Sequence, residues 1–510
     1  MKRRPLSEYT ERLRLEGLGF SSYMSEKEPT VEYLSYSSRD VRPGTLFICK
    51  GAAFKPEYLE EAINSGAVAA LVPKGAKELI SIAQNRGISV IEAENLRLAM
   101  SLIADSYFES VWKKLKIAAV TGTKGKSTVV YILKAIVEEY ESASGGKPPA
   151  ILSSIDTFDG VVLEESHLTT PEPIELYRHF ENAVNSGLSC LLMEASSQAL
   201  KYERLSCVRF SAAAFLNIGR DHISEIEHPD FEDYFGAKLK ILEKTAVCFV
   251  SGEMEESYRK RIYEAAEKAG CRIRSFGFDE SNELFAFGIR ALEDGTAFSI
   301  GRKGRPERDE LKLSLHGTFN VLNALAAIML AEELGIPYEY IKSGLKKAFV
   351  PGRMELFKVK GRVFIVDYAH NELSFNALFD AVKASYPDAG ISIVFGCPGG
   401  KAYNRRSELT KIASERADRI YLTEEDPGPE DVLDICREMG ENIERFSAGK
   451  AQYSIIPDRE EAIRRAFAES CEGQVILLTA KGRETRQKRG SEYIDVRSDV
   501  EIVEDIMREA

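Results

Sequence analysis

The sequence of 510 residues lacks any uninterrupted apolar run close to the roughly 20 residues that a membrane-spanning helix needs. The basic residues near its start are not followed by the apolar segment of a secretory signal peptide. Eight cysteines occur without a CxxC pair, which favours reduced thiols over a disulfide framework or a zinc site. These absences predict a cytoplasmic protein without membrane insertion.

The charge balance also limits the classes of partner. Charged residues make up 29% of the chain, and the formal net charge is -12. Because this surplus would repel nucleic-acid phosphates, we expect no nucleic-acid partner, although a local basic cleft could hold a small anion. Hydrophobic residues make up 44% of the chain. The length predicts roughly three domains, and this hydrophobic content is enough to bury a core in each of them.

Short apolar runs alternate with helical patterns along most of the chain, and we find no internal repeat. Such runs are typical of parallel strands buried on both faces, and their alternation with helices implies βαβ units and an α/β fold. The runs cover residues 45–49, 68–72, 117–120, 190–193, 212–216, 363–366, 391–395 and 475–478. Between Gly288 and Arg308 the sequence is rich in glycine and charge, which favours antiparallel strands there.

The most specific local motif is the stretch from Val120 to Thr128, which reads VTGTKGKST. The strand before it and the helix expected over 129–137 are the context of a phosphate-binding loop. Its glycines let backbone N–H groups approach phosphate, and the helix N-terminus favours anions. Lys126 can reach the β- and γ-phosphates, and Ser127 offers a hydroxyl to Mg²⁺. Since Val120 replaces the first glycine of a full Walker A motif, the alternative is an ordinary glycine-rich turn.

Two later strands are followed by residues able to hold a metal ion. Glu194 ends the apolar run that starts at Cys190, and His222 follows the run that ends at Leu216. Side chains at the carboxyl ends of parallel strands face the ligand crevice of an α/β sheet. We therefore expect both residues beside the nucleotide. The alternatives are a solvated glutamate and a structural histidine.

Taken in order, these motifs resemble those of the Mur ligases, ATP-dependent enzymes that form amide bonds in peptidoglycan precursor synthesis. The resemblance extends from Ser38 to about Gln487, and the ordered series is specific although each motif alone is weak. The motifs are Gly122–Thr128, Thr169–Glu172, Glu194–Ser197, Asn217, Asp221–His222, His316–Asn323, Pro351–Glu355, Asp367–Asn371 and Lys481–Gly482.

The resemblance implies three domains, with a UDP-sugar-binding domain over residues 1–110. A central P-loop ATPase-like domain would cover 111–350, and a Rossmann-like amino-acid-binding domain would cover 351–510. Pro351 and Gly352 suit the second boundary. The first domain resembles that of the MurE branch, although Ser37 stands where the family usually has aspartate. We expect a monomer.

By the same resemblance, the chain binds ATP, two Mg²⁺ ions and a UDP-MurNAc-dipeptide. The implied catalytic residues are Lys126, Glu194, His222 and Lys238. The implied magnesium ligands are Ser127, Glu194, His222 and Lys238. The implied nucleotide contacts are Gly122, Thr123, Lys124, Gly125, Lys126, Ser127, Thr128, Asn320, Asn323, Arg353 and Asp367. The implied contacts of the UDP-MurNAc-dipeptide are Ser38, Thr169, Thr170, Ser196 and Arg204.

Lys238 matches the lysine that the family carries as a carbamate. A bare ammonium would repel Mg²⁺, whereas a carbamate reverses the charge and can bind the ion. The alternative is an ordinary lysine on the surface of a helix.

The resemblance also implies a free amino acid as the second substrate. Family members that add diaminopimelate carry an arginine that pairs with its extra carboxylate, but this chain has Gly428 at that position. Glu425 and Asp426 place two negative charges nearby, which favours L-lysine or ornithine over diaminopimelate. The alternative is that both acids face solvent. Arg406 and Arg483 are candidates for the incoming α-carboxylate or the phosphates.

The implied reaction forms an acyl phosphate on the acceptor carboxylate, and the amine then displaces phosphate. Closure of the C-terminal domain would exclude water from this intermediate. One competing hypothesis is a folylpolyglutamate synthetase, which has a similar phosphate loop but lacks the first domain. Another is a degenerate, non-catalytic nucleotide-binding scaffold, against which the intact set of implied catalytic residues argues.

Overall fold

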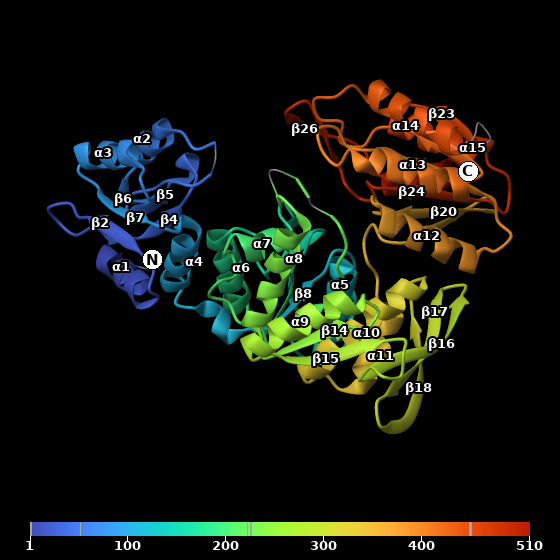
Figure 1. The fold of residues 1–510 in the computed structure, drawn as a ribbon, viewed down its shortest axis with the longest axis horizontal. Helices are drawn as coiled ribbons and strands as arrows, with labels where there is room; N and C mark the ends of the chain where they lie inside the picture. The colour runs from blue at the N-terminus through green and yellow to red at the C-terminus, as the bar shows by residue number, and fades with distance from the viewer. Residues whose placement is uncertain (1–2, 52, 222, 225–226, 448–450) are drawn as a thin grey trace.

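The computed structural model describes residues 3–51, 53–221, 223–224, 227–447 and 451–510, without the side chains of 306–308. Its strands form three main sheets in three lobes (Figure 1). In the part of the chain that is described, no helix combines the length and the apolar character needed to cross a bilayer. The predicted α/β class is confirmed.

The N-terminal lobe holds a sheet in the order β2-β7-β6-β5-β4, in which only β2 runs antiparallel to its neighbour. Alternate strand residues face opposite sides: Phe47 and Ala70 pack with α2 and α3, and Leu46 and Leu71 pack with α1 and α4. The elements of this lobe are β1 (Arg4–Pro5), α1 (Leu6–Leu15), β2 (Phe20–Tyr23), β3 (Thr30–Val31), β4 (Tyr33–Ser35), η1 (Ser38–Asp40), β5 (Thr45–Ile48), α2 (Pro56–Asn64), β6 (Ala67–Pro73), α3 (Lys77–Asn85), β7 (Ser89–Ala93) and α4 (Leu96–Tyr107), followed by η2 (Val111–Lys114).

The central lobe contains an eleven-stranded sheet in the order β11-β10-β9-β12-β8-β13-β14-β15-β16-β17-β18. Its first elements are β8 (Lys116–Thr121), α5 (Lys126–Ser144), β9 (Ala150–Leu152), β10 (Asp156–Phe158), β11 (Leu163–Glu165), α6 (Pro173–Asn185), β12 (Cys190–Glu194), α7 (Ser197–Lys201), β13 (Ala212–Phe215), α8 (Phe231–Leu239) and η3 (Lys240–Lys244). Its remaining elements are β14 (Val247–Ser251), α9 (Glu256–Ala269), β15 (Arg272–Gly277), β16 (Leu284–Leu292), β17 (Gly295–Arg302), β18 (Arg305–Leu313), α10 (Thr318–Glu333) and α11 (Tyr338–Lys347).

The middle strands of this sheet, from β9 to β16, pair in parallel. Strands β16, β17 and β18 pair antiparallel at one edge, which confirms the prediction for the glycine- and charge-rich segment. Helices α5, α10 and α11 share an apolar core with one face, and α6, α7 and α9 share a core with the other. Strand β8 lies between β12 and β13, so the carboxyl ends of all three lie together.

The C-terminal lobe has a sheet in the order β19-β20-β24-β21-β22-β23, in which β19 alone is antiparallel to its neighbour. Helices α12, α13 and α14 pack on one face, and α15 and α16 on the other, as the Rossmann-like prediction requires. The elements are β19 (Glu355–Val359), β20 (Arg362–Asp367), α12 (Glu372–Ser385), β21 (Ile391–Phe395), α13 (Asn404–Arg416), β22 (Arg419–Leu422), α14 (Val432–Ser447), β23 (Gln452–Ile455), α15 (Arg459–Glu469), β24 (Val475–Thr479), β25 (Arg486–Arg489), β26 (Glu492–Asp495) and α16 (Asp499–Glu509).

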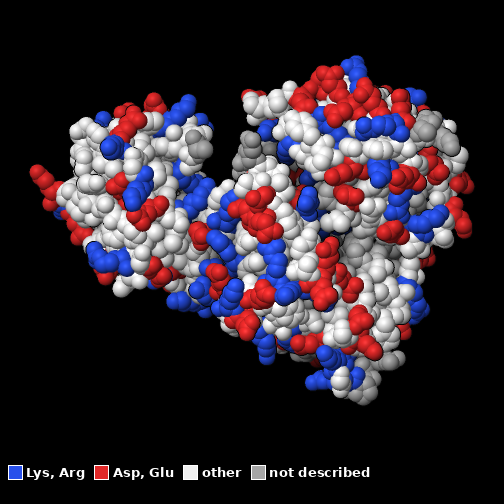
Figure 2. All heavy atoms as spheres, viewed as in Figure 1, with Lys and Arg blue, Asp and Glu red and all other residues white. Residues whose placement is uncertain are grey.

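The three lobes form a bent arrangement, with the N-terminal lobe at one end and the C-terminal lobe above the central lobe (Figure 1). A notch separates the two outer lobes, and acidic and basic side chains intermingle over this face (Figure 2). The three sheets occupy residues 20–93, 116–313 and 355–479. The domain boundaries after residues 110 and 350 stay predictions.

Candidate active site

The phosphate loop connects β8 to α5 at the carboxyl end of the central sheet. Gly125 has a φ of +85°, and a Cβ atom there would lie 2.5 Å from Oδ1 of Asn323, so glycine suits this position for two reasons. The Lys126 ammonium folds back over the loop and donates to the carbonyls of Gly122 at 3.1 Å and Thr123 at 3.4 Å. The loop therefore presents a cation beside the N-terminus of a long helix, an arrangement that favours phosphate.

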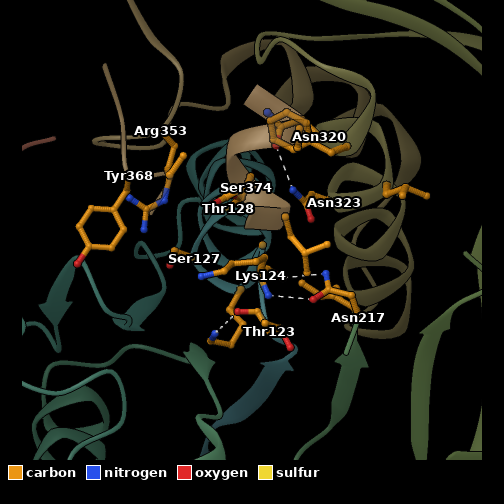
Figure 3. Close-up of a pocket in the computed structure, with 18 of the residues that line it drawn as sticks. Thr123, Lys124, Ser127, Thr128, Asn217, Asn320, Asn323, Arg353, Tyr368 and Ser374 are labelled. Carbon is orange, nitrogen blue, oxygen red and sulfur yellow. Dashed lines mark hydrogen bonds between the residues drawn. The ribbon is translucent and has the colours of Figure 1, made fainter. Parts of the chain in front are cut away.

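The backbone of this loop is held by Asn217, which follows β13. Its side-chain oxygen accepts from the Lys124 amide N–H at 2.9 Å, and its side-chain nitrogen donates to the Lys124 carbonyl at 3.0 Å (Figure 3). Because both backbone groups of Lys124 are bound, the loop has its shape before any ligand arrives.

Two of the implied magnesium ligands lie close together. Ser127 is in the first turn of α5, and its Oγ lies 3.0 Å from Oγ of Ser154. The Ser154 amide N–H donates to Oε1 of Glu194 at 2.8 Å, and Glu194 is buried at the end of β12. Sequence reasoning missed Ser154, for which the only signal was its place just after a strand. His222 lies outside the described residues.

These oxygen donors fit a magnesium ion. Among the described residues no three His, Cys, Asp or Glu side chains gather in a metal-binding group. Mg²⁺ at nucleotide sites commonly takes one or two protein oxygens and fills its shell with phosphates and water. The Ser127 hydroxyl and the Glu194 carboxylate, which both contact Ser154, provide that kind of partial coordination shell.

Lys238 projects from α8 toward the phosphate loop and is 1% exposed, so it is not a surface lysine. Its Nζ donates to the Gly122 carbonyl at 2.9 Å and lies 4.7 Å from the ring centroid of Tyr234. Burial, with the nearby charge of Lys126, holds the pKa of Lys238 well below its usual value. The neutral amine is therefore more accessible here than in an ordinary lysine.

A cavity of about 500 Å³ opens between the phosphate loop and the C-terminal lobe (Figure 3). Asn320 and Asn323 line one side of it, and the Asn323 side-chain nitrogen donates to Oδ1 of Asn320 at 3.0 Å. The predicted residues that line it are Thr123, Lys124, Gly125, Lys126, Ser127, Thr128, Thr169, Glu194, Asn320, Asn323, Arg353 and Asp367. Gly122 lies beside it as the acceptor for Lys126 and Lys238.

The C-terminal lobe provides the opposite wall of the cavity. The Asp367 carboxylate accepts from the amide N–H groups of Met354 at 2.9 Å and Ala369 at 2.8 Å. The Arg353 guanidinium lies 4.3 Å from the ring centroid of Tyr368 (Figure 3). The segment that joins the two lobes is therefore fastened to the strand end at Asp367.

A polar cluster links the phosphate loop to the C-terminal lobe. The Lys124 ammonium lies 3.1 Å from Oδ2 of Asp221 and 3.1 Å from Nε2 of His370. Nδ1 of His370 lies 2.7 Å from the Tyr368 carbonyl, so Nδ1 carries the proton and Nε2 accepts from Lys124. Burial lowers the pKa of Lys124 to about 8 and holds the pKa of His370 well below its usual value.

Three of the residues implied to bind the acceptor peptide form a hydrogen-bonded group beside Glu194, while Thr169 lines the cavity. The Thr170 hydroxyl donates to the Glu194 carbonyl at 2.8 Å and accepts from the Ser196 amide at 3.1 Å. The Arg204 guanidinium donates to the Thr170 carbonyl at 2.8 Å. Ser38 lies in η1 of the N-terminal lobe and does not line the cavity.

Glu172 connects this group to the N-terminal lobe. Its carboxylate pairs with Arg204 at 2.8 Å and with Lys50 at 3.0 Å. Lys50 follows β5, and its ammonium also lies 4.0 Å from the ring centroid of Tyr36. Sequence reasoning missed the Lys50 contact, because the two partners are far apart in the chain and only the packing of the lobes joins them.

The acidic loop after β22 is the implied amino-acid site. Glu424 pairs with Arg489 at 2.8 Å, and Asp426 pairs with Lys481 at 3.2 Å. Glu425 is buried, and this burial raises its pKa to about 7. The three acids are thus not equivalent, since two of them are paired with cations of the protein.

Arg406 and Arg483, the two arginines predicted as candidates to bind an anionic ligand, form ion pairs with acidic side chains of the protein. Arg406 pairs with Glu430 at 2.7 Å and with Glu438 at 2.6 Å. Arg483 donates to both carboxylate oxygens of Glu355, at 2.6 and 2.7 Å. Their assignment to a ligand stays a prediction.

Comparisons with known proteins agree with this geometry. The Mur ligase middle domain matches residues 120–331, and the Mur ligase glutamate ligase domain matches residues 352–482. The chain is 35% identical over 484 residues to a UDP-N-acetylmuramoyl-L-alanyl-D-glutamate–L-lysine ligase of Streptococcus thermophilus, with 94% of each chain covered. It is 30% identical over 502 residues to a UDP-N-acetylmuramoyl-L-alanyl-D-glutamate–2,6-diaminopimelate ligase of Clostridium perfringens, with 97% and 98% covered.

Among solved structures, the chain is similar to a UDP-N-acetylmuramoyl-L-alanyl-D-glutamate–2,6-diaminopimelate ligase. The TM-score is 0.64 and the sequence identity is 23%, with 94% of this chain and 95% of that chain covered. This likeness extends over all three lobes and supports the three-domain architecture.

Proposed function

The chain belongs to the Mur ligase family, and we propose that it joins L-lysine to UDP-N-acetylmuramoyl-L-alanyl-D-glutamate with cleavage of ATP to ADP. The observation that carries this proposal is one cavity that brings Lys126 and Glu194 of the central lobe together with Arg353 and Asp367 of the C-terminal lobe. The curated relatives match both the first lobe and the rest of the chain, which disfavours a folylpolyglutamate synthetase.

ATP fits the cavity with its phosphates on the loop that ends at Lys126. The N-terminus of α5 favours an anion, and the Lys126 side chain lies over the loop where it can contact phosphate oxygens. Asn320 and Asn323 lie where the adenine would stack against α10. Arg353 and Asp367 bring the C-terminal lobe onto the nucleotide, so that ATP binding and closure favour each other.

We assign one Mg²⁺ to Ser127 and Glu194, and a second to His222 and a carbamylated Lys238. Such ions neutralise charge on a transferring phosphoryl group. Lys238 fits the modification because burial lowers the pKa of its amine, so that the reactive neutral form is more accessible than in an ordinary lysine. That nitrogen can form a bond to the carbon of CO₂ with release of one proton. The role of His222 comes from the family resemblance.

The reaction proceeds in two steps. A carboxylate oxygen of the acceptor attacks the γ-phosphorus, the bond to the β-phosphate oxygen breaks, and ADP leaves. The lysine α-amine then attacks the acyl carbon, loses a proton and displaces phosphate. Thr170, Ser196 and Arg204 lie beside Glu194, where they orient the acceptor carboxylate toward the phosphate loop.

Lysine suits the acidic loop of the C-terminal lobe. Gly428 provides no guanidinium for the extra carboxylate of diaminopimelate, whereas Glu425 offers a carboxylate that no cation within 4 Å pairs with among the described residues. Ornithine, whose side chain is one methylene shorter, is the nearest alternative. The relatives carry both lysine and diaminopimelate names, with the lysine ligase at the higher identity.

Phosphate release tests the function directly. The wild type is incubated with ATP, Mg²⁺, UDP-N-acetylmuramoyl-L-alanyl-D-glutamate and lysine, ornithine or diaminopimelate in turn, with Glu194→Gln as the inactive control. Turnover with lysine is expected to exceed turnover with the other two. Binding of ATP without turnover on any amine would support a non-catalytic scaffold, and turnover with diaminopimelate alone would contradict the lysine assignment.

A further inference from the structure

Helix α13 begins with two adjacent arginines whose side chains have different surroundings. Arg406 is 4% exposed, and its two terminal nitrogens lie 2.6 Å from Glu438 and 2.7 Å from Glu430. The same guanidinium donates to the Pro398 carbonyl at 3.4 Å. These contacts fasten α13 to α14 and to the segment before it, so Arg406 serves the packing of the C-terminal lobe.

Arg405 reaches the central lobe instead. Its Nη2 lies 3.6 Å from Oδ1 of Asp221, and its side chain is 16% exposed. The other oxygen of Asp221 lies 3.1 Å from the Lys124 ammonium and accepts from the Asn371 side-chain amide at 3.1 Å. Asp221 therefore holds one cation from the phosphate loop and one from the C-terminal lobe.

The electrostatic effects of Arg405 extend to both halves of the reaction centre. Its charge contributes to the lowered pKa of Lys124 and of His370 beside the phosphate loop. It also opposes the burial that raises the pKa of Glu425 in the acidic loop. The charge of Arg405 therefore acts on the phosphate loop, which its side chain approaches at Asp221, and also on the acidic loop.

We propose that Arg405 is a phosphate-binding residue, which the C-terminal lobe supplies to the phosphoryl group as it moves from ATP to the acceptor carboxylate. The inference rests on the proposed function. Two cations facing one carboxylate leave a surplus of positive charge, which an arriving phosphoryl oxygen satisfies. A planar guanidinium binds two oxygens of one phosphoryl group, and donors of this kind stabilise charge that develops during transfer.

The contact with Asp221 favours a phosphoryl group over the α-carboxylate of the incoming amino acid. Asp221 is the partner of Lys124, and Lys124 belongs to the loop whose backbone cradles phosphate. A phosphate on that loop competes with Asp221 for both cations at once. Binding of the transferring group is thereby coupled to the contact between the two lobes.

The test compares Arg405→Gln and Arg405→Lys with Arg416→Gln, a matched change at the end of the same helix. Arg416 pairs with the exposed Asp380 and lies outside the proposed site. Single-turnover formation of ADP is measured with ATP and the acceptor but without amine, and the acyl phosphate is trapped with borohydride. Arg405→Gln is expected to slow this step by about 10²- to 10³-fold, as for other lost transition-state donors. The rate of ADP formation should fall less in Arg405→Lys, and in Arg416→Gln it should match that of the wild type.

Two further measurements separate phosphate binding from a structural role. Guanidinium ion at low millimolar concentration should restore part of the rate to Arg405→Ala, whose melting temperature should match that of the wild type. The affinity for ADP with aluminium fluoride, a phosphoryl mimic, should fall in Arg405→Gln while the affinity for ADP alone stays within about twofold.

An unchanged rate of ADP formation would overturn the proposal, as would a rise confined to the KM for the amino acid. The latter result would assign Arg405 to the α-carboxylate. If the wild type itself formed no acyl phosphate and ligated no amine, the proposed function would fail rather than the role of Arg405.

Discussion

At the scale of single residues, the charge of Glu425 is the most pH-sensitive feature of the proposed amino-acid site. Burial raises its pKa to about 7, and the charges of Arg405, Arg459 and Lys481 only partly oppose this rise, while Asp426 adds to it. A carboxyl in this state changes its charge within the range of pH at which most enzymes are assayed. Recognition of a cationic side chain by Glu425 must therefore depend on pH.

The KM for lysine is expected to rise as the pH falls from 8 to 6. Above its pKa Glu425 is ionised and attracts the lysine side chain, whereas below it the neutral carboxyl does not. Well below the pKa of Glu425, the KM for lysine should rise by at most about tenfold for each unit by which the pH falls. Steady-state kinetics at saturating ATP measure the effect, and Glu425→Gln should give a higher and flatter profile. A wild-type KM that does not change between pH 6 and 8 would contradict this role.

The candidate site residues whose local setting could be predicted from the sequence are those whose neighbours are close in the chain. Lys126 and Ser127 are positioned by a loop and helix that the local sequence specifies. The burial of Lys238 and the contacts of Ser154 and Arg405 depend on segments far apart in the chain. No local pattern distinguishes Arg405 from Arg406, because only the packing of α13 decides which of the two faces the central lobe.

At the scale of elements, the buried parallel strands were predictable because both of their faces are covered and their sequences are continuous apolar runs. The order of the strands could not be predicted from the sequence, because β8 pairs with β12 and β13 rather than with β9, the next strand in the chain. This order creates the crevice at the end of β8. The hairpin of β25 and β26 could not be predicted from the sequence either, because its strands are polar and show no alternation of apolar residues.

The two helices on one face of the C-terminal sheet are joined by a buried ion pair. Arg459 donates to both oxygens of Asp499 at 2.6 and 2.7 Å and to the Thr479 carbonyl at 2.7 Å. Asp499 also accepts from the Gly482 amide at 3.1 Å, so the pair holds the loop after β24. Since this loop carries Lys481, the position of α15 and α16 affects the acidic site.

Replacement of one partner of this pair should destabilise the C-terminal lobe. Arg459→Met leaves the Asp499 charge buried without its partner, which typically costs about 3–5 kcal/mol. The double variant with Asp499→Leu removes both charges and should recover part of that loss. Urea unfolding followed by fluorescence and circular dichroism measures the free energies. A double variant less stable than Arg459→Met would show that the pair does not act as a unit.

At the scale of the whole molecule, charged contacts and apolar packing join the lobes. Phe108, after α4, stacks on Tyr177 of α6 with ring centroids 6.0 Å apart, which joins the N-terminal and central lobes. Lys50 and Glu172 add an ion pair across the same junction. In the proposed reaction the acceptor extends from the N-terminal lobe, which is the predicted UDP-sugar-binding domain, to the phosphate loop, and we expect it to pass this pair.

Lys50→Met is expected to raise the KM for the UDP-linked acceptor by about tenfold, because Glu172 then pulls more strongly on Arg204. Loss of one member of a largely buried pair commonly costs more than 1.4 kcal/mol, which is the equivalent of tenfold. The KM for ATP should stay within about twofold, since neither Lys50 nor Glu172 lines the cavity proposed for the nucleotide. Lys74→Met provides the control, because Lys74 belongs to the same lobe but pairs with Glu94 on its surface. Equal rises in the KM values for acceptor and ATP would indicate a general loosening of the lobes instead. The double variant Lys50→Met with Glu172→Gln tests whether Lys50 acts through Glu172. If its KM for the acceptor is no higher than that of Lys50→Met alone, Glu172 is the residue through which Lys50 acts.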